Sequence, residues 1–320
     1  MVYVPYPRVD LNNHKDLTKW RSMVARKDGD WKQLKIFLEE QSRFMDIHAV
    51  PKCWYTELPQ GDNYALDVEH FRPKKQASPL NSKQIKKIEK KLGYPIYQAM
   101  NKGAYPWLEF DYRNYRLTTA LPNRAGAKHV FFPIAKNTVR LNDKDLPWEK
   151  SEYPLLLDPT DLHDSQQLVV LPNGLVEPRS KKNVLVAEDF DNIQLNWHSD
   201  GMNYLRASIT IEMYRLNDDR ILIKARKERF KNTSSDLDTL VQAISEKMSD
   251  VLKGMLIKPL AESILPSAPF SLASRCAMEA YTIDSSLDAL VIETTTNIIK
   301  MILHRVEKYN LETKVNWKNP

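Results

Sequence analysis

Apolar residues recur at helical spacing near the start of the chain. The run DWKQLKIFLEEQSRFM contains no helix-breaking residue, and its apolar positions fall on one face of a helix. These positions are Trp31, Leu34, Leu38 and Met45. We therefore predict an N-terminal helical segment over residues 1–50.

A second helical pattern lies in SSDLDTLVQAISEKMSDVLKGML, with Ser234 or Ser235 available as the N-cap. Its predicted buried face is continuous and consists of Leu237, Leu240, Val241, Ile244, Met248, Val251, Leu252 and Met255. A further helix is predicted over residues 285–306, with buried positions at Leu287, Leu290, Val291, Ile298, Ile302 and Val306. Residues 141–320 are thus expected to form a mainly helical region that supplies scaffold or a partner-docking surface.

Between these helical parts the pattern changes to short β-prone runs. CWYTEL, YALDVEHF and YRLTTAL alternate with turn residues and prolines from residue 51 to about residue 133. Further along, LLLDPTD and LVVLPNGLVEP are typical of short strands, and Asn173-Gly174 indicates a hairpin turn. The chain is therefore predicted to have a mixed α+β fold.

Charge adds a possible class of partner. The formal net charge is +6, from 47 Lys and Arg against 41 Asp and Glu, which is compatible with a polyanion but does not require one. Basic residues gather at positions 72–75, 83–91, 179–182 and 224–231. The second cluster has an alternative interpretation as the solvated face of an amphipathic helix, because Ile85, Ile88 and Leu92 share one side.

Composition also bears on the cellular compartment of the protein and on whether it enters a membrane. No stretch approaches eighteen consecutive apolar residues, and the first twenty residues lack the apolar core of a secretory signal. The two cysteines, Cys53 and Cys276, are too few for a disulfide framework. We therefore expect a cytoplasmic protein with no membrane partner.

The residues with candidate chemistry lie in the β-prone part. Phosphodiester hydrolysis needs a base that activates water and a cation that stabilises charge on the phosphate. His70 is the candidate base, and Glu69 beside it is a candidate ligand for a hard cation such as Mg²⁺. Asn123 offers an amide oxygen to the same cation, and Asp67 is a weaker candidate ligand on the same strand face as Glu69.

Other residues of this segment have predicted supporting tasks. Asn114 comes directly before the β-prone run YRLTTAL, where its side chain could hold the loop that carries His70. Several basic side chains surround these positions and are predicted to bind phosphates next to the scissile bond. They are Arg72, Lys74, Lys75, Arg124, Lys128 and His129. Cys276 is predicted to be an inert, buried helix residue.

The ordered set E-H-F-R-P-K, W-L-E-F-D-Y-R-N, P-N-x₄-K and F-F-P resembles the HNH nucleases, which have a ββα-metal core. More narrowly, residues 30–230 are similar to the PtuB-type HNH proteins of Septu and retron-associated antiphage defence systems. The resemblance implies His70 as general base, Asn114 as the middle Asn, and Glu69 and Asn123 as ligands of Mg²⁺ or Mn²⁺. It also implies an HNH module over residues 51–140 with an insertion at 76–105, embedded in a predominantly helical protein and controlled by a PtuA-type ATPase partner.

The chain departs from that family at the positions of a structural zinc. Two cysteine pairs often hold the family's core, whereas here the pairs read Cys53…Thr56 and Thr119…Pro122. We therefore expect no structural zinc, and a core held by packing around Trp54, Trp107, Phe110 and Phe131. Three hypotheses for the function remain. They are a DNA-cleaving HNH nuclease, a nuclease for RNA such as tRNA, and an inactive HNH-like subunit that binds nucleic acid or assembles with other proteins.

Overall fold

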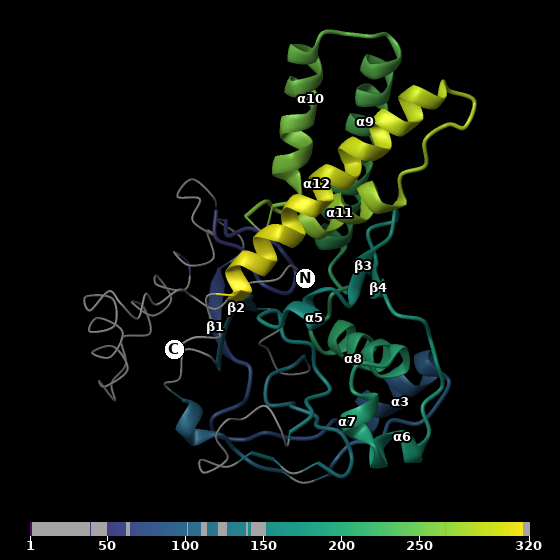
Figure 1. Ribbon diagram of the computed structural model, residues 1–320. Helices are drawn as coiled ribbons and strands as arrows, with labels where there is room; N and C mark the ends of the chain where they lie inside the picture. Colours follow the sequence, from purple (N-terminus) through teal and green to yellow (C-terminus); the bar gives the residue numbers. More distant parts are fainter. Residues whose placement is uncertain are drawn as a thin grey trace.

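A computed structural model describes most of the chain (Figure 1). The described residues are 1, 39, 50–61, 65–100, 102–109, 114–120, 127–138, 140–141, 152–265 and 267–315, with side chains up to residue 304. The predicted N-terminal helical segment lies almost wholly outside these residues. Asn123, Arg124 and Phe110 lie outside them too.

The described residues form an α+β fold with two small antiparallel sheets. The strands are β1 (Leu66–His70), β2 (Tyr115–Thr119), β3 (Leu168–Val170) and β4 (Val176–Pro178). The helices are α3 (Ser82–Leu92), η1 (Pro106–Leu108), α5 (Leu162–Ser165), α6 (Ala187–Asp191), α7 (Ile193–Asn196), α8 (Asp200–Met213), α9 (Arg220–Ser245), α10 (Asp250–Ser263), α11 (Ser271–Ala280) and α12 (Ala289–Val315). Among the described helices, none combines the length and apolar character that a membrane crossing requires.

The first sheet joins the two β-prone runs that carry the candidate chemistry. β1 pairs with β2, so that Glu69 lies opposite Arg116 and His70 opposite Tyr115. Side chains alternate between the two faces of a strand, so Glu69 and His70 point to opposite faces of the sheet. Directly opposed residues share a face, which places the His70 imidazole beside the Tyr115 ring.

The second sheet is the predicted hairpin at Asn173-Gly174, and it is confirmed. Gly174 has a φ of +85°, and a Cβ atom at this position would lie 2.1 Å from the main-chain oxygen of Ile223 in α9. The turn therefore needs glycine for its backbone conformation and for the close approach of α9. LLLDPTD, by contrast, forms no regular strand; its three leucines are instead fully buried in the main core.

The main hydrophobic core lies around the first sheet, α3, α8 and α11. Trp54 is buried in it as expected, and Phe131 packs against it. Trp107 is 38% exposed, so the expectation that it anchors the core is wrong. Cys276 is buried in α11, as predicted, and its sulfur accepts a hydrogen bond from the Val170 N–H (3.3 Å).

The long helical pattern after residue 219 folds as a hairpin of two helices (Figure 1). α9 begins at Arg220, with Asp219 as its N-cap, and ends at Ser245. Lys247 then adopts a φ of +52°, and Ser249 caps α10 by accepting a hydrogen bond from the Leu252 N–H. The predicted start at Ser234 or Ser235 and the single continuous face are both wrong, because this turn reverses the chain.

The turn also decides which apolar residues are buried. Those before it contribute to a second core between α9, α10 and α12, and are Leu237, Leu240, Val241 and Ile244. Those after it are exposed instead, and are Met248, Val251, Leu252 and Met255. In α12, Val291 and Ile302 are buried as predicted, whereas Leu290 is 69% exposed.

A buried carboxylate links the segment before β1 to the C-terminal helices. Glu57 accepts hydrogen bonds from the Leu272 N–H (3.0 Å) and the Ser271 hydroxyl (3.3 Å) at the start of α11. Its carboxylate also lies 3.9 Å from the Lys52 ammonium and 3.2 Å from the Met1 amino group. Glu57 thus satisfies one N–H group at the start of α11 and the charge of a lysine that is itself buried.

Replacing Glu57 by Ala should therefore lower the free energy of unfolding by about 3 kcal/mol, because it leaves the buried Lys52 without a carboxylate partner. Urea denaturation of both proteins measures the change. Glu228→Ala is the matched control, since Glu228 forms an exposed pair with Lys224 (3.8 Å) and its loss should cost less than about 1 kcal/mol. Equal losses in the two variants would contradict the role given to Glu57.

Candidate active site

His70 lies at the end of β1 with its imidazole ring held on one side. Its Nε2 atom is 2.9 Å from the main-chain oxygen of Glu109, and its ring meets the Tyr115 ring edge-on with centroids 5.1 Å apart. The Tyr115 hydroxyl donates to the same Glu109 oxygen (2.5 Å). Because a carbonyl can only accept, Nε2 carries the proton and the lone pair of the neutral ring is on Nδ1.

The surroundings also keep His70 neutral. Burial is the main cause that lowers its pKa to about 4, and the positive charges of Lys74 and Lys128 act in the same direction. The hydrogen bond to the Glu109 oxygen opposes this shift without cancelling it. At neutral pH the ring is therefore an unprotonated base in one defined tautomer.

Asn114 holds the loop that follows His70. Its side-chain oxygen accepts from the Arg72 N–H (2.8 Å), while its side-chain nitrogen donates to the Arg72 oxygen (2.9 Å) and the Leu108 oxygen (3.2 Å). Its main-chain oxygen accepts from the Phe71 N–H (2.8 Å). These bonds connect the end of β1, the 3₁₀ turn η1 and the start of β2. The sequence also predicted Asn114 directly before this strand.

Glu69 points into the protein rather than toward His70. Its carboxylate is 2% exposed, and its Oε1 atom lies 2.6 Å from the Lys128 ammonium and accepts from the Tyr214 hydroxyl (3.1 Å). The Tyr214 ring stacks on Tyr55 with centroids 3.7 Å apart. The second carboxylate oxygen, Oε2, is buried and has no hydrogen-bond partner among the residues that the structure describes.

Lys128 is not available to a phosphate, contrary to expectation. It is fully buried, and its ammonium donates to the main-chain oxygen of His70 (2.6 Å) as well as to Glu69. Burial lowers the pKa of Lys128, while the Glu69 charge raises it. Lys128 therefore holds β1 from inside, next to the residue that carries the candidate base.

The remaining basic candidates divide into paired and exposed residues. Arg72 forms an ion pair with Glu152 (2.8 Å), with its guanidinium over the Phe132 ring, so it is largely committed to the protein interior. Lys74 pairs with the Glu109 carboxylate (2.7 Å) close to His70. Lys75 and His129 are exposed, and His129 has a φ of +38°.

The turn at residues 53–56 is held on β2 by hydrogen bonds and packing. The Thr56 N–H donates to the Cys53 sulfur (3.4 Å), and that sulfur lies 3.8 Å from the Thr118 hydroxyl of β2. The Trp54 N–H donates to the Leu117 oxygen (2.9 Å). Cys53, Thr56 and Thr119 are all buried, so this turn packs closely on β2.

The described residues do not by themselves complete a site for a divalent cation. Within them there is no group of three His, Cys, Asp or Glu side chains close enough to hold a metal. Glu69 offers only Oε2, since Oε1 is bonded to Lys128 and Tyr214, and Asp67 lies half-buried two positions earlier on the strand. A cation at Glu69 would share its carboxylate with an ammonium group, which raises the electrostatic cost of binding.

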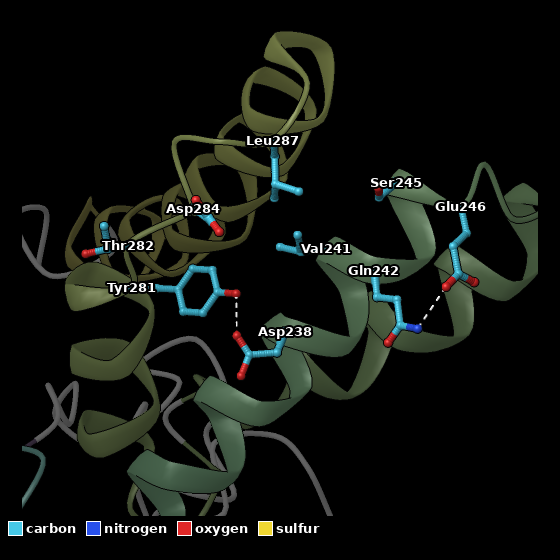
Figure 2. A pocket seen from close by; sticks show the side chains of 9 residues that line it. All are labelled: Asp238, Val241, Gln242, Ser245, Glu246, Tyr281, Thr282, Asp284 and Leu287. Carbon is cyan, nitrogen blue, oxygen red and sulfur yellow. Dashed lines mark hydrogen bonds between the residues drawn. The ribbon is translucent and has the colours of Figure 1, made fainter.

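A cleft of about 370 Å³ lies elsewhere, between α9 and the segment before α12 (Figure 2). Two of its carboxylates already serve other side chains: Asp238 accepts from the Tyr281 hydroxyl (2.6 Å), and Glu246 accepts from the Gln242 amide (2.8 Å). Asp284 adds a third acidic group to the lining. We assign no chemistry to this cleft.

Sequence reasoning missed three contributors to the site. The Glu109 main-chain oxygen orients His70, and a main-chain atom leaves no signal in the residue type. Tyr115 is the first residue of the β-prone run YRLTTAL, so its place opposite His70 could have been found from the strand pairing. Tyr214 follows α8, and no pattern connects it to Glu69, 145 positions away.

Comparisons of this chain with protein-family models, with curated proteins and with solved structures return no match. The function proposed below therefore rests on the residues of this chain and on the motif resemblance.

The lowered pKa of His70 predicts a pH-dependent stability. The ordinary pKa near 6.5 falls to about 4 on folding, so between these values the unfolded chain binds a proton that the folded chain does not. Stability is therefore lost as pH falls from 6.5 toward 4, by about 1 kcal/mol at pH 5 for this partly exposed ring. Urea denaturation at pH 7.5 and 5 should show a smaller loss in His70→Asn, and equal losses would exclude a depressed pKa.

The buried ion pair predicts strong coupling between its two partners. Lys128→Met should lower the free energy of unfolding by about 3 kcal/mol, because the Glu69 carboxylate stays buried without its cation. The double variant Glu69→Gln/Lys128→Met should recover part of that loss, since a neutral amide needs no counter-charge. A double-mutant cycle by urea denaturation measures the coupling, and additive effects within about 0.5 kcal/mol would contradict the pair.

Proposed function

We propose that this protein is an HNH-type endonuclease that hydrolyses phosphodiester bonds of nucleic acid, with DNA the favoured substrate. The observation that carries the proposal is the state of His70: neutral, with Nε2–H bonded to the Glu109 oxygen and the lone pair on Nδ1. This is the state a general base needs before it can take a proton from water. The ordered motifs around His70 support the same assignment.

In this proposal, His70 accepts a proton from the attacking water at Nδ1. The imidazolium that forms is stabilised by its hydrogen bond to the Glu109 oxygen. Asn114 is a positioning residue, because it holds the backbone of Arg72 and so fixes the direction of the ring. The exposed Lys75 and His129 and the half-exposed Lys74 are suited to bind neighbouring phosphates. We also propose Arg124 as a phosphate-binding residue and Asn123 as a metal ligand.

The proposed cofactor is Mg²⁺ or Mn²⁺, which follows from the motif resemblance. The described residues offer it only Glu69 Oε2 and, more weakly, Asp67, so the proposal treats metal dependence as a property to be tested.

The choice between DNA and RNA is also part of the proposal. A site built around one phosphate contacts the backbone, which both polymers share, and reads few bases. Cleavage of a structured RNA such as tRNA is the alternative that keeps the same chemistry.

A protein partner is part of the same proposal. We expect an ATPase of the PtuA type to restrain the nuclease in an antiphage defence system. The exposed side chains of Met248, Val251, Leu252 and Met255 support a partner-docking role for the C-terminal helices, since exposed apolar rows mark interaction surfaces.

One observation favours a second candidate function. Glu69, the expected metal ligand, is paired with the buried Lys128. A catalytically inactive HNH-like subunit that binds nucleic acid or assembles with other proteins would retain the fold with such a pair. Activity that requires both a divalent cation and His70 separates the two candidates.

Cleavage of supercoiled plasmid and total tRNA tests the proposal directly. The full chain, alone and with a PtuA-type ATPase, should cleave one of them in Mg²⁺ or Mn²⁺ and not in EDTA. His70→Ala should lower the rate at least about 100-fold, the usual contribution of a general base. Agarose gels and denaturing polyacrylamide gels measure the products.

His198→Ala is the matched control, because this histidine precedes α8 and contacts His163 rather than the sheet. It should cleave at the wild-type rate. Cleavage that persists in His70→Ala would overturn the assignment of the base, and no cleavage under any of these conditions would favour the inactive subunit.

A further inference from the structure

Helix α3 presents an unusual concentration of positive charge. Five lysines lie on its 11 residues and all are exposed: Lys83, Lys86, Lys87, Lys90 and Lys91. Its apolar face, with Ile88 and Leu92, is buried in the main core. The helix has one acidic residue, Glu89, whose carboxylate accepts a hydrogen bond from the Ile96 N–H (2.9 Å).

A second basic segment lies beside this helix in space, although it is about ninety positions away in sequence. The Lys182 ammonium donates to the main-chain oxygen of Lys91 (3.4 Å), at the end of α3. Figure 1 shows the segment between β4 and α6 passing α3. Lys181 and Lys182 are exposed there. We call the five lysines of α3 together with Lys181 and Lys182 the basic face.

Folding alone does not account for this charge. Glu212 neutralises part of it through Lys87 and Lys91, the latter at 3.0 Å. Lys83, Lys86 and Lys90 form no ion pair among the described residues. They lie three, four and seven positions apart, so they repel one another along the helix. Nothing in the packing of α3 requires lysine at these exposed positions, since the helix is held by Ile88 and Leu92 and by the capping box of Asn81 and Gln84.

The partner that best fits this surface is a linear polyanion. A helix that binds a membrane inserts its apolar face into the bilayer, but the apolar face of α3 is occupied by the protein core. What remains outside is a row of flexible cationic side chains on a rigid support, which suits a chain of regularly spaced phosphates.

We propose that the basic face binds the phosphodiester backbone of nucleic acid at a distance from His70, so that the substrate contacts α3 and residues 181–182 as well as the active site. This inference rests on the proposed nuclease function for the identity of the nucleic acid as substrate. The contacts are to the backbone, so they add affinity and orientation without reading sequence.

Binding of a fluorescent 40-base-pair DNA duplex to the full chain in EDTA tests the proposal without interference from cleavage. Lys83→Ala/Lys86→Ala/Lys90→Ala should raise the dissociation constant at least about tenfold in 100 mM salt. The slope of log K against log salt should fall by about three, one for each lost phosphate contact. Alanine favours helix more than lysine, so the triple variant should fold, which circular dichroism verifies.

The matched control is Lys224→Ala/Lys227→Ala/Lys231→Ala, which removes the same charge from exposed positions of α9. It should bind the duplex about as tightly as the wild type. Equal weakening in both variants, or none in the α3 variant, would overturn the basic face as the binding surface. Preferential binding of vesicles that contain phosphatidylserine would overturn the choice of nucleic acid.

The outcome is separable from that of the nuclease proposal. If the basic face does not bind nucleic acid, the α3 variant binds the duplex like the wild type, while cleavage still depends on His70. If the protein is not a nuclease, no cleavage is seen, while the α3 variant still binds the duplex more weakly than the control variant. A structured RNA run beside the duplex shows which of the two polymers the surface prefers.

Discussion

The buried ion pair between Glu69 and Lys128 is the interaction on which the candidate site depends. Both side chains are removed from water, so each needs the other's charge, and neither can leave without exposing an uncompensated ion to the interior. The same Lys128 ammonium binds the main-chain oxygen of His70, and Tyr214 adds a hydrogen bond to Glu69 from the end of α8. The strand end that carries the candidate base is therefore anchored from within the protein.

The chemistry of His70 follows from this anchoring and from its burial. The ring sits between the Glu109 oxygen and Tyr115, close to two lysines, and these surroundings favour the neutral form. Asn114 completes the arrangement through its side chain, which bonds twice to the Arg72 backbone in the loop after His70 and once to the Leu108 oxygen of η1. A base with a depressed pKa and one tautomer is thus a product of the contacts that also hold the loop.

Buried polar contacts also hold the turn that precedes β1. The Cys53–Thr56 turn packs on β2 through a thiol, hydroxyl groups and main-chain hydrogen bonds. One residue further, Glu57 reaches the start of α11 and connects the segment before β1 to the C-terminal helices. A few charged and polar side chains thereby join parts of the chain that are about 215 positions apart.

Periodicity and turn chemistry in the sequence were enough to predict the hairpin at Asn173-Gly174 and the basic helix α3, because these depend on neighbouring residues. The expected contact between Asn114 and the loop after His70 joins Asn114 to Arg72, 42 positions earlier, so it depends on the pairing of β1 with β2. Other features needed the tertiary structure. The break between α9 and α10 depends on a positive φ at Lys247 that no apolar pattern reveals, and it exposes Val251 and Met255. From the sequence, Lys128 was expected at the surface. The structure buries it beside Glu69, because a buried ammonium needs an opposite charge close by. The sequence by itself determined which side chains could do chemistry, and long-range packing decided which of them face one another.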